Sequence, residues 1–76
     1  RPHWHKDGNC WTCLFYVTPE YDIEENGETQ FLEDGEIRGI LPKKDRLIVF
    51  DGVLQHRATP FRNYPRITVA LKYWKE

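Results

Sequence analysis

A histidine and a carboxylate stand two residues apart near the start of the chain, as His5 and Asp7. On an extended backbone, residues at this spacing point to the same side, so the imidazole and the carboxylate converge. A further histidine, His56, follows the apolar run 47–50 much later in the chain. Two histidines and one carboxylate hold one face of an Fe(II) ion and leave its other positions open for chemistry. These three residues are therefore the candidate metal ligands and the candidate catalytic residues.

Two simpler interpretations of the same residues stay open on spacing alone. A His-x-Asp pair is short and common, so it is also compatible with a surface pair that has no connection to His56. The His3-x-His5 pair is similar to the opening of a cupin metal motif, but residues 9–10 are Asn and Cys where that motif would place a glutamate. The neighbouring motifs have to separate these alternatives.

A small zinc site is a third alternative, because Cys-x-x-Cys is a recognised zinc-binding pattern. Residues three apart on a strand point to opposite faces, so Cys10 and Cys13 are poorly placed to share one ion. Such a site would also leave His56 without a role. Its four ligands would be His3, His5, Cys10 and Cys13.

The size and charge of the chain narrow the class of protein. Seventy-six residues allow one domain with a small core. A formal net charge of -1 gives no electrostatic reason to expect nucleic acid or an anionic membrane as a partner. No apolar run approaches the roughly 20 residues of a membrane-spanning helix. Two cysteines are too few for a disulfide framework, which favours free thiols and a cytoplasmic location.

Short β-prone runs alternate with turn residues along the whole sequence, and no segment has a helical pattern. Asn26-Gly27 and Asp34-Gly35 are hairpin-type turn signals, and prolines end several runs. Frequent short strands in so short a chain predict an all-β sandwich or barrel-like roll. The expected strands are 1–7, 11–18, 28–32, 36–41, 46–50, 55–59 and 66–74, with an acidic, solvated loop at 20–26 and the 46–50 strand buried.

The motifs around the candidate ligands resemble those of Fe(II)- and 2-oxoglutarate-dependent oxygenases of the prolyl-hydroxylase type. The resemblance extends over nearly the whole chain and has a fixed order. It comprises the His-x-Asp strand at 5–8, the Cys-x-Thr-Cys-aliphatic-aromatic-Tyr strand at 10–17, a Gly-Gly-Glu-Thr-x-Phe-like segment at 26–31, the run 42–50 before the distal histidine at 56, and Arg-x-Ser/Thr at 66–68.

This resemblance implies a double-stranded β-helix of the jelly-roll, cupin-like type over residues 1–76, acting as one catalytic core. The expected reaction is hydroxylation of an unactivated C–H bond, with a prolyl residue of a peptide or protein as the expected substrate and succinate and CO₂ as coproducts. The implied cofactors are Fe(II), 2-oxoglutarate and O₂, with ascorbate as a candidate reductant. The implied metal ligands are His5, Asp7 and His56.

The resemblance also implies residues that bind 2-oxoglutarate. A guanidinium binds a carboxylate in a two-pronged manner, which suits Arg66. Thr68 lies on the same strand face as Arg66, and the resemblance implies hydroxyl contacts from Thr68 and Tyr16. Arg57 and Arg62 are rivals for the cation: the first should point away from the site because it follows His56, and the second lies in an expected loop.

The chain departs from the family pattern in two places. Asn26 stands where the family has the first glycine of a pair. The family's first core strand and its N-terminal helices have no counterpart, so we expect a fragment of a longer domain with one sheet face left uncovered. The expected partners are a peptide, protein or small-molecule substrate, and either a second copy of the chain or the missing N-terminal region. A non-catalytic β-roll that serves as an interaction module remains the competing class.

Overall fold

The computed structural model describes residues 3–17, 26–60, 62 and 68–76. Within these residues there are strands, turns and loops but no helix, so the all-β prediction is confirmed. A search of the same residues finds no helix long and apolar enough to span a membrane. The strands are β1 (Cys10–Tyr16), β2 (Thr29–Glu33), β3 (Glu36–Ile40), β4 (Leu47–Asp51), β5 (Gln55–Ala58) and β6 (Thr68–Trp74).

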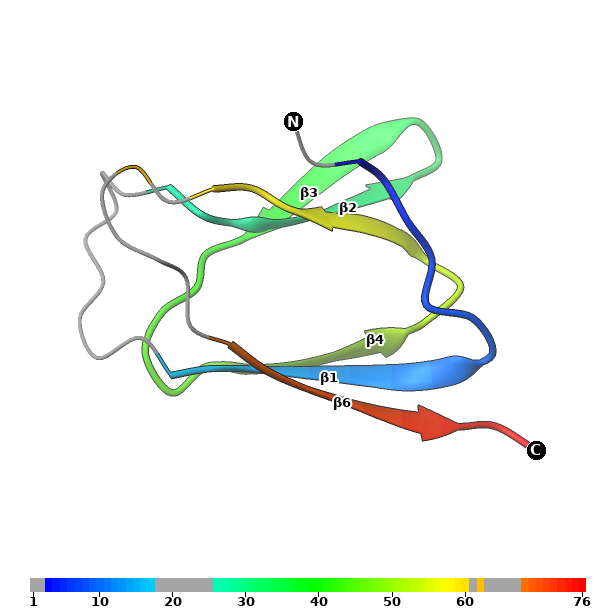
Figure 1. Cartoon of the computed structure of the whole chain (residues 1–76). Coiled ribbons are helices and arrows are strands. Elements are labelled where there is room, and N and C mark those ends of the chain that lie inside the picture. Colours follow the sequence, from blue (N-terminus) through cyan, green and yellow to red (C-terminus); the bar gives the residue numbers. More distant parts are fainter. Residues whose placement is uncertain (1–2, 18–25, 61, 63–67) are drawn as a thin grey trace.

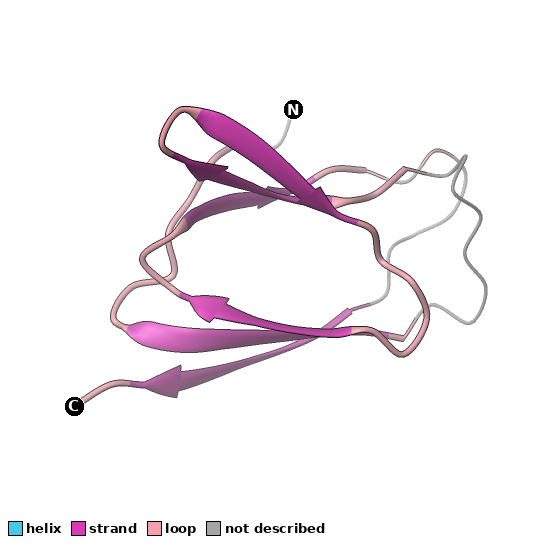
Figure 2. Ribbon diagram, turned by 180° about the vertical axis from the view of Figure 1, so that it is seen from behind, coloured by secondary structure: helices cyan, strands magenta, loops and turns pink. Residues whose placement is uncertain are grey.

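Two antiparallel three-stranded sheets face each other (Figures 1 and 2). The first sheet has the order β4-β1-β6 and the second the order β3-β2-β5. Apart from the β2–β3 hairpin, each strand lies in the sheet opposite to the strand before it. This alternation is typical of a jelly roll and agrees with the predicted jelly-roll-like fold.

The hairpin between β2 and β3 forms where the sequence signal places it. Asp34 and Gly35 both have positive φ, at 53° and 77°. That backbone belongs to a type I′ turn, whose twist matches the flanking strands and which favours Asp-Gly. Glu33 therefore pairs directly with Glu36, and the register of the hairpin is fixed.

The centre of the first sheet is β1, whose side chains alternate between the interior and the surface. Cys10, Thr12 and Tyr16 are buried, whereas Trp11 is exposed. Side chains also join the two sheets across the interior. The rings of Phe31 on β2 and Phe50 on β4 meet edge to face with centroids 4.8 Å apart.

Two predictions about strands are wrong. The first is the strand at 1–7, because in the described part of that segment only His5 pairs with another strand, through an isolated bridge to His56. The second is the buried strand at 46–50: the strand exists as β4, but Leu47 and Val49 are 60% and 57% exposed. An antiparallel sheet that packs on one face only must expose every second residue. Residues 20–25 and 66–67, which also carried predictions, lie outside the described residues.

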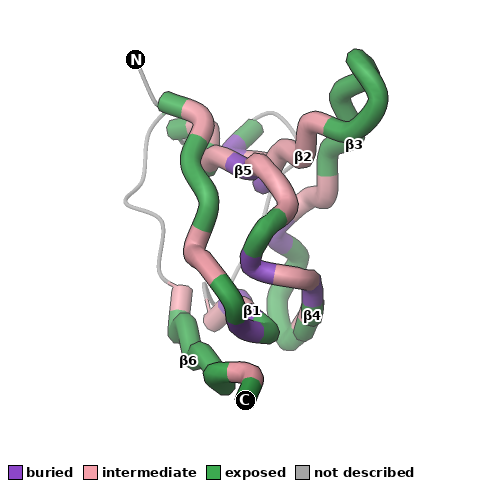
Figure 3. Tube along the Cα trace, turned by 90° about the vertical axis from the view of Figure 1, so that its right-hand side faces the viewer, coloured by how far each residue is buried: buried purple, intermediate pink, exposed green. Residues whose placement is uncertain are grey.

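The outer face of the β4-β1-β6 sheet is apolar and exposed, which confirms the expectation of an uncovered sheet face. Figure 3 shows β6 exposed along almost its whole length. Antiparallel pairing aligns the outward side chains into rows across the three strands. These rows are Leu47–Phe15–Val69, Val49–Cys13–Leu71 and Asp51–Trp11–Tyr73.

We expect this outer face to bind a hydrophobic dye, because contiguous apolar patches of this kind attract apolar partners. The double substitution Val49→Lys/Leu71→Lys places two charges in its central row and should remove most of the dye fluorescence. Val53→Lys is the matched control, since Val53 is 52% exposed but lies in the turn after β4. Dye binding that survives the double substitution would show that the patch lies elsewhere.

Candidate metal centre

Backbone hydrogen bonds hold the segment that carries the first two candidate ligands. The amide of His5 donates to the carbonyl of His56 at 3.0 Å, and the amide of His56 donates back at 2.9 Å. Further along, the amides of Asp7 and Gly8 both donate to the carbonyl of Gly52, at 2.7 and 3.2 Å. The segment is thus fixed against β5 at one end and against the turn after β4 at the other.

Gly52 is required at this turn because the chains approach too closely for a side chain. A Cβ atom there would lie 2.6 Å from the Cys10 sulfur and 2.7 Å from the carbonyl oxygen of Gly8. Its own amide donates to the carbonyl of Cys10 at 2.7 Å. The absence of a side chain at Gly52 therefore lets the Asp7 segment lie against both the turn and the start of β1.

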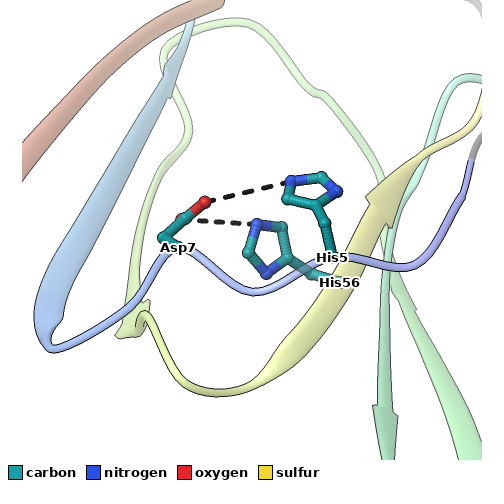
Figure 4. A group of neighbouring side chains, drawn as sticks. All are labelled: His5, Asp7 and His56. Carbon is teal, nitrogen blue, oxygen red and sulfur yellow. Dashed lines mark ion pairs between the residues drawn. The ribbon is translucent and has the colours of Figure 1, made fainter.

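The three predicted metal ligands converge at one point (Figure 4). One candidate ligand atom from each of His5, Asp7 and His56 lies within 4.8 Å of the other two. The Nε2 atoms of His56 and His5 lie 3.3 and 3.9 Å from the two carboxylate oxygens of Asp7. The side chains of Asp7 and His56 are 8% and 6% exposed, whereas that of His5 is 56% exposed. The site therefore has two sheltered ligands and one ligand open to solvent.

The hydrogen bonding of His56 fits a cation at this point. Its Nδ1 lies 2.8 Å from the carbonyl oxygen of Leu54, which can only accept, so Nδ1 carries the proton. In neutral His56 the Nε2 atom is then an acceptor that faces another acceptor, Asp7 Oδ2. Two facing acceptors in a sheltered site call for a cation between them. A carbonyl that fixes the tautomer in this way is typical of metal-ligating histidines.

The Asp7 carboxylate is held by β1 in the opposite sheet. The hydroxyl of Thr12 donates to Asp7 Oδ2 at 2.7 Å. Partial burial acts to raise the pKa of Asp7, but the hydrogen bond from Thr12 and the electrostatic influence of the nearby His56, Lys72 and His5 outweigh it and lower the pKa below its ordinary value. The group is therefore a carboxylate, the form that ligates metal, at neutral pH.

A cavity of about 410 Å³ opens beside the three ligands. Thr68, predicted to contact 2-oxoglutarate, lines it together with Thr29 on the opposite sheet. The hydroxyl of Tyr16, the other predicted contact, is fully buried and hydrogen-bonded to Thr29 Oγ1 at 2.5 Å. Arg66, the predicted cation, lies outside the described residues.

Arg57, the nearer rival cation, lines the cavity, so the expectation that it points away from the site is wrong, but its side chain is engaged by other residues. Its Nε donates to Gln30 Oε1 at 2.7 Å, and its guanidinium lies 4.2 Å from the centroid of the Trp4 ring. Trp4 immediately precedes His5, so Arg57 helps to hold the ligand-bearing segment against β5. Arg62, the other rival, is exposed.

The cysteine-containing zinc alternative does not fit the described residues. Cys10 is buried inside the sandwich, whereas Cys13 lies in the outward-facing row with Val49 and Leu71. Among the described residues, the group of potential metal ligands that does form contains no cysteine. The two thiols are free and separate.

Sequence reasoning missed two residues of this site, Thr12 and Lys72. The bond of Thr12 to Asp7 depends on how the loop that precedes β1 turns back. Lys72 has its Nζ 3.7 Å from Asp7 Oδ1 and lines the cavity. Strand alternation from Thr68 would have placed Lys72 on the same inner face.

Comparison with known families identifies the class of protein. The profile of the 2OG-Fe(II) oxygenase superfamily matches residues 2–74. This covers nearly the whole chain, and the chain belongs to that superfamily. No curated protein and no solved structure gives a match.

Members of this superfamily use Fe(II), 2-oxoglutarate and O₂, and the donor set of this chain suits that metal. Two imidazoles and one carboxylate on one side of an ion are typical of non-haem Fe(II) sites. The chain is thus an oxidoreductase of the dioxygenase class.

We expect Thr12→Val to weaken metal binding, because it removes the donor that orients Asp7 while keeping the size of the side chain. Loss of such an orienting partner typically costs about 10- to 100-fold in metal affinity. Isothermal titration calorimetry with Mn(II) measures the change in metal affinity. Thr12→Ser is the control, because it retains the hydroxyl. Equal affinity in Thr12→Val and the parent would show that the bond does not position Asp7.

Proposed function

We propose that the chain is a prolyl-hydroxylase-like 2-oxoglutarate dioxygenase whose Fe(II) is held by His5, Asp7 and His56. The observation that carries the proposal is the convergence of these three side chains beside a cavity. The orientation of His56 by Leu54 and of Asp7 by Thr12 supports it, since both ligands are prepared before an ion arrives.

Each residue of the site has a separate task in this proposal. Asp7 supplies the negative charge for the ion, and His56 a neutral nitrogen whose tautomer is already set. His5 completes the set from the exposed side, where the ion can enter. When bound, Fe(II) with 2-oxoglutarate and O₂ supplies the oxidising chemistry, in which the cosubstrate becomes succinate and CO₂ and the substrate gains a hydroxyl group. The protein contributes the geometry and a sheltered cavity.

The proposed site for 2-oxoglutarate extends from the ion along the cavity towards Thr68. Arg66 would bind the far carboxylate, and Thr68 and Tyr16 would orient it. Three observations support this: Thr68 lies on the cavity wall, Tyr16 is its register partner on β1, and the Tyr16 hydroxyl is hydrogen-bonded to the lining residue Thr29.

The proposed substrate is a prolyl residue of a peptide or protein, acted on by a single domain. The support is the resemblance of the segments at 10–17 and 26–31 to prolyl hydroxylases. A cytoplasmic location accords with the two free cysteines and belongs to the same proposal. Incubation of the iron-loaded protein with 2-oxoglutarate and proline-containing peptides tests it: we expect succinate and a peptide heavier by one oxygen atom. Succinate release that no prolyl peptide increases would contradict this choice of substrate.

The competing class, a β-roll that binds partners without catalysis, gains support only from the exposed outer face of the β4-β1-β6 sheet. A non-catalytic binding module would need neither the oriented imidazole of His56 nor the sheltered carboxylate of Asp7. Metal binding therefore discriminates between the two classes.

We expect His56→Ala and Asp7→Ala each to abolish stoichiometric Mn(II) binding, because each removes a sheltered ligand. His3→Ala is the matched control: His3 is exposed and offers only its backbone carbonyl to His5. Calorimetric titration gives the stoichiometry. Parent-like binding by His56→Ala would refute the assignment, and zinc retained by His5→Ala/Asp7→Ala would favour a cysteine-containing site.

Arg66→Ala should weaken binding of 2-oxoglutarate to the Mn(II)-loaded protein. Loss of a two-pronged ion pair in a sheltered pocket costs about 2–5 kcal/mol, which is some tens- to thousands-fold in affinity. Arg66→Lys should restore only part of the affinity, because an ammonium cannot reproduce the paired geometry. Arg57→Ala and Arg62→Ala are the comparisons, and a larger loss in either would transfer the role to that residue.

A further inference from the structure

Lys72 lies on the inner face of β6, where the mechanism proposed above gives it no task. Thr68, Ala70 and Lys72 alternate along this strand and all line the cavity. The ammonium of Lys72 is 3.7 Å from Oδ1 of Asp7, and its side chain is 45% exposed. A flexible cation therefore lies at the mouth of the cavity, against the one carboxylate of the metal site.

Lys72 lies where its ammonium would compete with a divalent ion for Asp7. The ammonium balances the charge of a carboxylate that is only 8% exposed. A divalent ion held by Asp7 would lie close to the same ammonium, and like charges at such distances repel. The long side chain of Lys72 can move away because nearly half of it is in solvent.

We propose that Lys72 is a displaceable counter-ion of Asp7, which the metal releases and which then binds the carboxylate at the metal end of 2-oxoglutarate. This inference rests on the proposed function of the site. Its support is geometric: the ammonium lies beside Asp7, and the side chain lines the cavity next to the metal ligands.

Lys72 and Arg66 are proposed to bind different carboxylates of 2-oxoglutarate: Lys72 the one at the metal end and Arg66 the far one. Four residues along a strand span about 13 Å, so Lys72 and Thr68 serve opposite ends of the cavity. Arg57, which also borders the cavity, is engaged with Gln30 and Trp4. Of the cations on the described part of the cavity wall, Lys72 is thus the one free to meet an anion at the metal end.

The first arm of the test measures Mn(II) affinity in the parent, in Lys72→Gln and in the control Lys44→Gln, which changes an exposed lysine in the turn before β4. Removing a partly exposed competing cation should tighten Mn(II) binding by about two- to fivefold. The gain should shrink at high salt, where the charges are screened. Lys72→Arg, which keeps the charge, should resemble the parent. Unchanged or weaker binding by Lys72→Gln would overturn the counter-ion function.

The second arm uses two 2-oxo acids on the Mn(II)-saturated proteins. 2-Oxobutyrate shares the metal end of 2-oxoglutarate but lacks the far carboxylate. Lys72→Gln should weaken both ligands by the same factor, about two- to fivefold, whereas Arg66→Ala should weaken 2-oxoglutarate alone. A loss in Lys72→Gln that is confined to 2-oxoglutarate, or no loss, would overturn the assignment of Lys72 to the metal end.

The two arms keep this inference distinct from the proposed function. A parent protein that binds no Mn(II) refutes the metal site, and the inference with it. A parent that binds Mn(II) through His56 and Asp7, but whose affinity does not respond to Lys72→Gln, refutes only the inference. Circular dichroism of each variant verifies that the fold is retained, which the exposure of Lys72 leads us to expect.

Discussion

The site depends on the reciprocal backbone pairing between His5 and His56. These two amides and two carbonyls join the beginning of the chain to β5, with bonds of 3.0 and 2.9 Å. Directly opposed residues in such a pair project to the same face, so one bridge brings two imidazoles together, with ring centroids 4.2 Å apart. The cation–π contact between Arg57 and Trp4 lies beside this bridge and supports it from the neighbouring positions.

The metal site also joins the two sheets. His56 belongs to the β3-β2-β5 sheet and His5 is paired to it, whereas Asp7 is bonded to Thr12 and lies beside Lys72, both in the β4-β1-β6 sheet. Tyr16 is the largest fully buried side chain in the part of the chain that the structure describes. An ion shared by His56 and Asp7 would therefore add a cross-link where the apolar core is small, and binding energy would appear as stability of the fold.

Local chemistry explains why parts of this structure could be predicted from the sequence. Strand alternation separates the buried Thr12 from the exposed Trp11, and Asp34-Gly35 fixes a hairpin register, because these features depend on neighbours in the chain. The convergence of His5, Asp7 and His56 was predictable because their types suit one ion and their motifs resemble a family. The strand expected at 1–7 was wrong because after His5 the backbone turns to the carbonyl of Gly52 instead of continuing along β5. This turn depends on the close approach of the 5–8 segment to the distant Gly52, and no local sequence signal predicts such an approach.

Two residues of the site, Thr12 and Lys72, were not predicted, because their positions are tied to the charge of Asp7 and not to a sequence pattern. Thr12 and Lys72 belong to different strands, one five residues after Asp7 and the other far along the chain, yet one contacts Oδ2 and the other lies beside Oδ1. Their shared feature is the inner face of one sheet, opposite the two histidines. A carboxylate sheltered from water needs donors and cations around it, because an unpaired buried charge is costly. The hydroxyl of Thr12 and the ammonium of Lys72 contribute to meeting that need, and a divalent ion would take over the part that Lys72 carries.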